Sequence, residues 1–504
     1  MKHTVKKKLV CIPLSVLLLL FCLSFSFSGY SQSIKYSAEI SERGFDYAKV
    51  IGQTDDGIYV LLSNFPMSST KDRVGFKSRK YKVAFFDFAM IRKWSVPIVA
   101  GDYLDIDNIS FACEKVLITY SKETSNKREF YLQWINNRGV SLGGNTKNFE
   151  LNFQKNSNYD KMEVTTSNDK SKILLLMHEI TTNNYQVFHC VVTDSTLQIT
   201  PPRIIDLPYK ESLFIADEFD VSNVGDIAVS GVLNKEKKSK SKFFDGTNMI
   251  YTIAANDTAV KSHEFKNSTK MISECSIVFD NNNNRLVVAG FYIDTEVTIG
   301  SGVSFQFYYV KGDSSSENFT ASFDPNKDEE LKGARNGNDV NNLTNYSIKK
   351  IFMRAGGGAV VIAESYSANN YSYFDYFTQS YYQRTEYRYG NILIVAINNK
   401  GVIEFSKLIK KQQNSIDDGA AYSSYMGMVS ADALTLFYNK DISSSNEILS
   451  VSINAKGVRT DKSIVRNAQQ IWIMPRDGKQ VSADEIIAPA YQKKKLVLAK
   501  ITLE

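Results

Sequence analysis

Short apolar segments separated by polar turns are the dominant pattern along the chain. Residues 391–408 show it most clearly, because an Ile- and Val-rich run reaches Asn398-Asn399-Lys400-Gly401 and a second alternating run then follows. Asn and Gly tolerate the positive φ that tight hairpin turns require. The pattern therefore predicts two antiparallel strands joined by a turn, and similar segments recur through the sequence.

The recurring unit holds four short strands, which we name a, b, c and d in chain order. Its most apolar member, strand b, opens after a polar or glycine-containing turn and is followed by a second apolar strand with its own hairpin turn. Eight copies of strand b are recognisable, and they begin at Gly57, Lys115, Lys172, Gly225, Arg285, Gly358, Ala433 and Glu485. The repeat predicts an all-β array of four-stranded antiparallel units.

Over residues 33–504 this four-strand period resembles the β-propeller superfamily, in which each blade buries its faces against its neighbours. The resemblance implies an eight-bladed ring, with seven blades plus a degenerate pair as the alternative. The sequence has no Gly-His to Trp-Asp pattern of WD40 repeats, no sialidase S-x-D-x-G-x-T-W box and no quinoprotein W-motif. No subfamily follows, and no catalytic residue can be transferred from one.

The two ends of the chain predict how the ring closes. The last unit has strands a, b and c but no strand d before Glu504, whereas residues 33–40 (SIKYSAEI) precede the first unit and belong to none. We expect residues 33–40 to pair beside the last strand c, which would remove an open sheet edge. The alternative is an ordinary leading strand.

The N-terminus has the layout of a secretory signal peptide. Four lysines within residues 1–8 precede the uncharged, Leu-rich run 9–27, and Gly29 and Ser31 supply small residues for cleavage before Gln32. We therefore expect a signal peptide at 1–31, a single domain at 32–504, and a periplasmic, cell-surface or extracellular location without a membrane span. The alternative is an uncleaved anchor, because about 18 apolar residues can span a bilayer.

Charge and cysteine content narrow the range of partners. The formal net charge is +6, and four of the positive charges leave with the signal peptide, so nothing supports nucleic-acid binding. Cys113, Cys190 and Cys275 remain, each in an apolar strand-like context. An odd number does not form a disulfide framework, so we expect buried thiols, of which one pair at most could bridge.

The insertions fall at one end of the units. In a four-stranded antiparallel blade, the b-to-c and d-to-a loops emerge on one face of the ring. The longest segments are of these two kinds, at 63–80, 234–245, 292–303, 324–345 and 365–389, and residues 325–334 within them have helical character. Long loops gathered on one edge of a rigid scaffold commonly carry binding sites.

The most distinctive insertion is residues 365–389, which hold eight tyrosines and two phenylalanines. Tyrosine offers a rigid apolar surface with a polar tip, which suits contact with proteins or sugar rings. The candidate binding residues are Tyr371, Tyr373, Phe374, Tyr376, Phe377, Tyr381, Tyr382 and Tyr387. The alternative is an elongated b-to-c hairpin whose aromatic side chains pack on one another, and the two interpretations are compatible.

Candidate catalytic groups are sparse. Asp105, Asp107, Asp217 and Asp220 lie on predicted strands a, which line a propeller's channel, so they could act as acid and base on a sugar or bind Ca²⁺. Turn chemistry is the favoured alternative for such residues. His178, His189 and Cys190 form a weak candidate metal set on adjacent strands. We predict no metal and no cofactor.

These patterns favour an exported binding or scaffold module that recognises a protein or a glycan through the face with the long b-to-c and d-to-a loops. A glycan-active hydrolase or lyase that uses the channel carboxylates is the alternative. A third possibility is a component of a cell-envelope assembly that docks through the Tyr-rich hairpin. Binding is preferred to catalysis because no catalytic motif is recognisable in the sequence.

Overall fold

The computed structural model describes residues 32–40, 42–65, 79–101, 104–124, 127–144, 146–160, 162–234, 246–265, 270–294, 301–309, 317–322, 345–377, 379–442, 447–465, 470–493 and 495–503. These residues form eight antiparallel sheets. Seven are built around four strands in sequence order, and the eighth combines strands from both ends of the chain. The predicted signal peptide (1–31) and the predicted helical segment (325–334) lie outside the described residues.

The first four blades follow the predicted order. Blade 1 contains β2 (Tyr47–Thr54), β3 (Gly57–Ser63), β4 (Tyr81–Phe86) and β5 (Arg92–Ile98). Blade 2 contains β6 (Asp105–Ala112), β7 (Lys115–Thr124), β8 (Lys127–Ile135), β9 (Ser141–Gly143) and β10 (Phe149–Asn152). Blade 3 contains β11 (Asn158–Tyr159), β12 (Glu163–Thr166), β13 (Ile173–Ile180), β14 (Tyr185–Thr193) and β15 (Arg203–Lys210). Blade 4 contains β16 (Phe214–Val221), β17 (Ile227–Leu233), β18 (Thr247–Ile253) and β19 (Val260–Phe265).

The remaining blades complete the ring. Blade 5 contains β20 (Lys270–Asp280), β21 (Arg285–Asp294), β22 (Ser301–Tyr309) and β23 (Glu317–Ser322). Blade 6 contains β24 (Tyr346–Met353), β25 (Ala359–Asp375), β26 (Ser380–Ile397), β27 (Ile403–Ile409) and β28 (Gln413–Ile416). Blade 7 contains β29 (Met426–Val429), β30 (Ala433–Asn439), β31 (Ile448–Asn454) and β32 (Arg459–Val465). Blade 8 contains β33 (Ile471–Ile473), a 3-10 turn (Pro475–Asp477), β34 (Lys479–Gln480), β35 (Glu485–Gln492), β36 (Lys495–Leu503) and β1 (Gln32–Tyr36).

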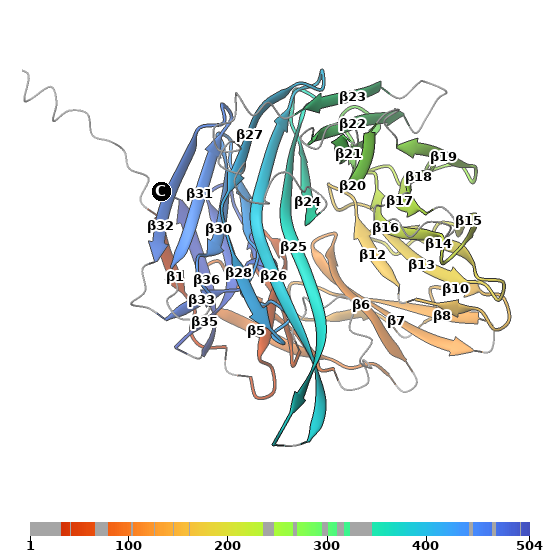
Figure 1. Ribbon diagram of the computed structural model, residues 1–504. Coiled ribbons are helices and arrows are strands. Elements are labelled where there is room, and N and C mark those ends of the chain that lie inside the picture. The colour runs from red at the N-terminus through yellow and green to blue at the C-terminus, as the bar shows by residue number, and fades with distance from the viewer. Residues whose placement is uncertain are drawn as a thin grey trace, which may run out of the picture.

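The hydrophobic core lies between the blades. Eight clusters of buried apolar residues each join two consecutive blades, and the cluster that joins blade 8 to blade 1 includes Val50 and Leu498. The second strand of each blade is the most apolar because it is covered on both faces, and β3 is buried at every position. The chain is therefore an eight-bladed β-propeller, and Figure 1 shows the blue C-terminal blade beside the red N-terminal strands.

The N-terminal strand closes the ring as predicted. β1 pairs antiparallel with β36 over Gln32↔Leu503 to Tyr36↔Ala499. The Ser37 and Ile40 amides continue the contact by donating to the carbonyls of Leu498 and Leu496 at 2.9 and 2.8 Å. Blade 8 thus takes its outermost strand from the opposite end of the chain, and β36 has no free edge.

The innermost strands surround the propeller axis and are irregular. Contacts link β2 to β6, β6 to β12, β12 to β16, β16 to β20 and β20 to β24 around the axis. Five of these strands carry a β-bulge, with Ile51, Asp107, Asp217, Ser273 and Lys349 as the extra residues. A bulge breaks the alternation of side chains along a strand, so sequence position alone does not fix which side chains reach the channel.

The predicted cysteine state is partly correct. Cys190 and Cys275 are buried free thiols, whereas Cys113 is a free thiol that is only half-buried. Cys113 sits in the turn between β6 and β7, where its Sγ lies 3.1 Å from the Lys170 carbonyl oxygen. Its half-exposure corrects the expectation of three buried thiols, because a turn residue is not covered on both sides as a strand residue is.

In the described part of the chain, no helix has the length and apolarity needed to cross a membrane.

Candidate functional site

The Tyr-rich segment forms a long two-stranded arm. β25 and β26 pair from Ala359↔Ile397 out to Asp375↔Ser380, with one register shift between Glu364 and Tyr366, which confirms an elongated b-to-c hairpin. β28 braces its base by pairing with Glu386 to Tyr389, whereas residues 371–384 pair only within the hairpin among the described strands. Figure 1 shows β25 and β26 running past the other strands to a tip that stands clear of the ring.

Aromatic side chains are packed along this arm and exposed at its end. The Tyr373 and Tyr382 rings stack at 5.7 Å between centroids, and the Arg384 guanidinium lies 4.4 Å from the Tyr373 ring. The Phe374 ring packs against the Tyr376 and Tyr381 rings, with 5.2 and 5.0 Å between the ring centroids.

The aromatic side chains at the tip of the arm are largely exposed to solvent. Tyr376, Phe377 and Tyr381 are 85%, 102% and 75% exposed. The other predicted binding residues are less exposed: Tyr371, Phe374 and Tyr382 at 36–41%, with Tyr373 and Tyr387 half-buried. The arm therefore presents an apolar tip on a stem that is held by its own cross-strand contacts.

The two aspartates of blade 2 are separated by the β6 bulge. Asp105 is exposed at the start of β6, whereas Asp107 is buried and ion-paired, with its Oδ1 accepting a hydrogen bond from the Arg128 Nη2 at 2.8 Å. Arg128 also donates to the Ser121 hydroxyl at 2.8 Å. Asp107 is therefore held in an ion pair that leaves it almost no contact with solvent, and the structure does not bring it together with Asp105.

The acidic residues of β16 connect blade 4 to blade 5. The Asp220 Oδ2 accepts the Phe279 amide at 2.8 Å, and burial raises the pKa of Asp220 to about 6. Glu218 accepts the Ser276 hydroxyl at 2.7 Å and the Ile277 amide at 2.9 Å, and burial raises its pKa to about 7. These carboxyl groups are hydrogen-bonded across a blade boundary, which stabilises the contact between inner strands.

The same kind of contact recurs one blade further on. Glu274 accepts the Ser347 hydroxyl at 3.1 Å and the Ile348 amide at 3.3 Å. Burial, followed by the nearby Asp217 charge, raises the pKa of Glu274 to about 7. Asp217, the exposed bulge residue of β16, thus lies close to both Glu218 and Glu274. The sequence interpretation included Asp217 and Asp220 but missed both glutamates, whose positions beside the bulges have no local sequence signal.

The two histidines of blade 3 do not come together. His178 lies opposite Phe188 and His189 lies opposite Met177, so they occupy offset positions on neighbouring strands. The His178 Nδ1 contacts the Asp160 Oδ2 at 2.9 Å, and the His189 Nε2 contacts the Glu179 Oε2 at 2.7 Å. Each imidazole has its own carboxylate partner. Among the described residues, no group of three or more His, Cys, Asp or Glu side chains could hold a metal ion.

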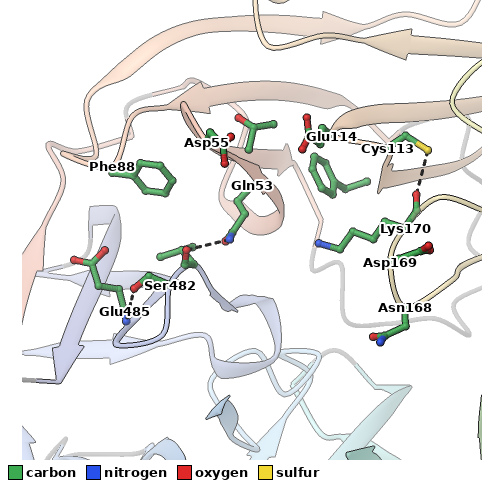
Figure 2. Close-up of a pocket in the computed structure, with 13 residues that line it drawn as sticks. Gln53, Asp55, Phe88, Cys113, Glu114, Asn168, Asp169, Lys170, Ser482 and Glu485 are labelled. Atoms are coloured by element: carbon green, nitrogen blue, oxygen red, sulfur yellow. Dashed lines mark hydrogen bonds between the residues drawn. The ribbon is translucent and has the colours of Figure 1, made fainter. Parts of the chain in front are cut away.

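A cavity of about 580 Å³, which we name the turn cavity, opens where the a-to-b turns of blades 1, 2, 3 and 8 converge. Figure 2 shows Lys170 extending across it towards Gln53, while the Gln53 Nε2 donates to the Val481 carbonyl at 3.0 Å. Its ionisable lining is mostly acidic: Asp55, Glu114, Asp169 and Glu485, with Lys170. This end of the channel holds few of the residues singled out from sequence.

A second cavity, of about 510 Å³, has the opposite charge, and we name it the basic cavity. It lies among the inner strands of blades 6, 7 and 8, with Tyr389 at the base of the Tyr-rich arm on its wall. The lining comprises Lys349, Lys350, Phe352, Tyr389, Ser424, Tyr425, Met426, Gly427, Pro475, Arg476, Gly478, Lys479 and Gln480. Four of these side chains are cationic and none is a carboxylate. The sequence interpretation did not find this cluster, because its cationic members come from blades 6 and 8 and are far apart in the sequence.

Comparisons with known proteins do not narrow the function. No protein-family model and no curated protein matches the sequence. Among solved structures, the chain is similar to the WD40 domain of SCAP from fission yeast, at 11% identity and a TM-score of 0.38, covering 92% of this chain and 99% of that one. It is also similar to polysaccharide lyase Uly1, at 9% identity and a TM-score of 0.34, covering 91% and 99%. At such low scores the fold assignment rests on the strand topology described above.

Proposed function

We propose that this protein is an exported binding module whose Tyr-rich arm docks into a partner protein. The observation that carries the proposal is the exposure of Tyr376, Phe377 and Tyr381 at the tip of a paired arm. Exposed apolar clusters are unfavourable in water unless a partner covers them, and Tyr and Phe are enriched at the centres of protein interfaces. The export of the chain is part of the proposal and rests on the sequence of residues 1–31.

The shape of the arm favours a protein over a glycan as its partner. Sites for small ligands, sugars included, are concave and enclose most of the ligand. The end of a hairpin is convex, so a sugar ring placed against Tyr376 or Phe377 would be contacted from one side only. A groove on a protein could enclose the whole tip, with Arg384 and Tyr373 on the stem beside it. The tip aromatics would then act as the anchor residues of the interface.

Hydrogen bonds near its base hold the stem of the arm in place, which favours docking by the tip. The Thr385 amide donates to the Asp417 Oδ1 at 2.8 Å and the Asp417 amide donates back to the Thr385 carbonyl at 3.0 Å. The Thr385 hydroxyl also donates to the Asn370 Oδ1 at 2.7 Å. A braced stem lowers the entropy lost when the tip is immobilised on a partner.

Replacement of the arm tests the proposal. Residues 371–384, which pair only within the hairpin, would be exchanged for a short Asn-Gly turn, and pull-down of envelope proteins and glycan-array binding would be compared with those of the intact protein. We expect a protein captured by the intact molecule to be lost from the variant while the melting temperature stays close to the original. Retention of the same protein by the variant would refute the arm as the contact, and binding of glycans alone would refute a protein partner.

A glycan-active hydrolase or lyase is the second candidate function. It is favoured by Glu218 and Glu274, whose pKa values of about 7 would leave a general acid partly protonated at neutral pH. Both carboxyl groups are already hydrogen-bonded between blades, which favours a structural role for them. Release of reducing ends or of unsaturated sugars from a polysaccharide panel would support this function, and loss of that activity in Glu218→Gln would assign it.

A further inference from the structure

The basic cavity holds positive charge that described carboxylates do not neutralise. Lys350, Arg476 and Lys479 line it from blades 6 and 8, and none of them forms an ion pair with a carboxylate in the described part of the chain. Glu274 interacts electrostatically with Lys349, and Asp477 with Arg476, but both pairs are farther apart than an ion pair. Like charges gathered in one recess raise the free energy of the folded state, so the arrangement costs stability.

Two other lysines in the blades that line this cavity form ion pairs. Lys411 is fully buried behind it and contacts the Glu364 Oε1 at 2.9 Å, and the Ser424 hydroxyl donates to the Glu364 Oε2 at 2.5 Å. In the last blade, the Lys500 Nζ contacts the Glu485 Oε1 at 2.8 Å. Blades 6 and 8 thus contain lysines whose charge is neutralised by a carboxylate, unlike the cations that line the basic cavity. Lys350, Arg476 and Lys479 instead contact carbonyl oxygens or aromatic rings, and no described carboxylate pairs with their charge.

One atom of the Arg476 side chain points to a bound anion. The Arg476 Nη2 is used by the fold, since it donates to the Gly419 and Ala420 carbonyls at 2.6 Å each. The Arg476 Nε is buried and has no hydrogen-bond partner among the described residues. A buried N–H donor without an acceptor is unfavourable, and an anionic oxygen would satisfy it.

The cations lie beside aromatic rings. The Arg476 guanidinium lies 5.3 Å from the Tyr389 ring centroid, and the Lys350 Nζ lies 4.8 Å from the Phe352 ring centroid. Tyr425 adds a third ring to the lining. Aromatic rings offer a flat surface to the C–H face of a pyranose, and ammonium or guanidinium groups bind a carboxylate attached to the same ring.

From these observations we propose that the basic cavity binds a uronate-containing oligosaccharide, with Lys350, Lys479 and Arg476 on the sugar carboxylate and the aromatic rings on the sugar face. The volume of about 510 Å³ falls within the range of small-ligand sites. The site is separate from the exposed tip of the arm, so the proposal does not depend on the proposed function.

Calorimetry on the mature chain would test this site with galacturonate, mannuronate and glucuronate disaccharides, their neutral counterparts and inorganic phosphate. We expect at least one uronate disaccharide to bind, and its neutral counterpart to bind roughly 10-fold or more weakly. The Lys350→Gln/Lys479→Gln variant should weaken uronate binding by a similar factor. The control variant Lys400→Gln/Lys456→Gln removes the same charge from exposed turns and should bind like the original.

Each outcome decides between the site and its alternatives. Equal affinity of the Lys350→Gln/Lys479→Gln variant and the control, with both melting like the original, would overturn the site. Phosphate binding as tight as uronate binding would overturn the saccharide assignment, as would the failure of all three uronates to bind. The variant Tyr376→Ser/Phe377→Ser/Tyr381→Ser should keep uronate binding, which distinguishes this proposal from failure of the arm as a docking element.

Discussion

Arg128 and Asp107 form a buried ion pair between β8 and the bulge of β6, with 2.8 Å between the Nη2 and the Oδ1. The Asp107 side chain is 1% exposed and that of Arg128 is 11% exposed, so water contributes little to solvating either charge. Removal of one partner would leave the other charge buried and uncompensated.

The first prediction concerns this pair. Asp107→Ala should lower the free energy of unfolding by about 3–5 kcal/mol, because the buried guanidinium loses its counter-charge. Asp105→Ala, two residues away but exposed, should change it by less than about 0.5 kcal/mol. Urea denaturation followed by tryptophan fluorescence would measure both. Equal effects of the two substitutions would show that Asp107 is not held as described.

The sequence interpretation grouped Asp105 with Asp107, whereas the structure separates them, and the reason is local geometry. Strict alternation places residues 105 and 107 on one face of a strand, whereas the extra residue between Ile106 and Asn108 turns Asp107 into the interior. A bulge is set by the partner strand and the neighbouring blade, so no local residue pattern reveals it. The basic cavity is hidden for a related reason, since Lys350 and Arg476 come from different blades.

The eight blades, by contrast, follow from the sequence. Each strand b is buried on both faces and must therefore be a nearly continuous apolar run. The turn before it usually contains Gly, Asn or Asp, although Cys113 and Glu114 form this turn in blade 2. The closing strand could be predicted because the last unit lacked one strand and residues 33–40 lacked a unit. The arm could be located from its tyrosines, but its paired stem required the structure.

The second prediction concerns ring closure. Deletion of residues 32–40 should lower the melting temperature by roughly 5 °C or more, because the deletion removes the β1–β36 ladder and the buried Ile40 side chain. Calorimetric scans of the mature chain and of the deletion variant would measure the change. The tip variant Tyr376→Ser/Phe377→Ser/Tyr381→Ser is the control and should melt like the original. An unchanged melting curve after deletion would contradict closure by β1.

The third prediction concerns the inter-blade carboxyl groups. The folded-state pKa of Glu218 and of Glu274 is about 7, raised from 4.5, and that of Asp220 is about 6, raised from 3.8. The folded protein therefore keeps protons that the unfolded chain has lost. The stability contributed by the protonated groups is present below pH 4 and is lost as pH rises through about 7.

Denaturation between pH 5 and pH 8 would test this. The free energy of unfolding should fall over this range. Glu218→Gln/Glu274→Gln should make it depend less on pH, because Gln does not titrate. Gln can still accept the same amide hydrogen bonds. The double variant keeps an uncharged side chain at every pH. An identical pH dependence in the variant and the original would contradict the assignment of these two groups.

The fourth prediction concerns the pH dependence of the basic cavity. Burial, followed by the charges of Lys170, Lys350 and Lys49, lowers the pKa of Lys479 to about 8. Its Nζ also donates to the Ile51 carbonyl at 3.0 Å and lies 5.6 Å from the Phe111 ring centroid. A bound carboxylate favours the charged ammonium, so uronate affinity should fall as pH rises from 7 to 9.

Calorimetry across this pH range would measure the decline, and Lys479→Gln should reduce its steepness. The remaining dependence in that variant would come from Lys350, whose pKa burial also lowers. A uronate affinity that stays constant from pH 7 to pH 9 in the original protein would contradict a role for Lys479 in binding the anion.

The exposed tip of the Tyr-rich arm is proposed to anchor a partner protein. The most direct measurement is the affinity of a captured and purified partner for three forms of the mature chain, by surface plasmon resonance. The tip variant Tyr376→Ser/Phe377→Ser/Tyr381→Ser should bind about 100-fold or more weakly than the original, since anchor residues carry most of the binding energy. The control Ile91→Ser/Val402→Ser/Val458→Ser, which changes three exposed apolar residues elsewhere, should bind like the original. Equal affinity of all three forms would contradict the claim.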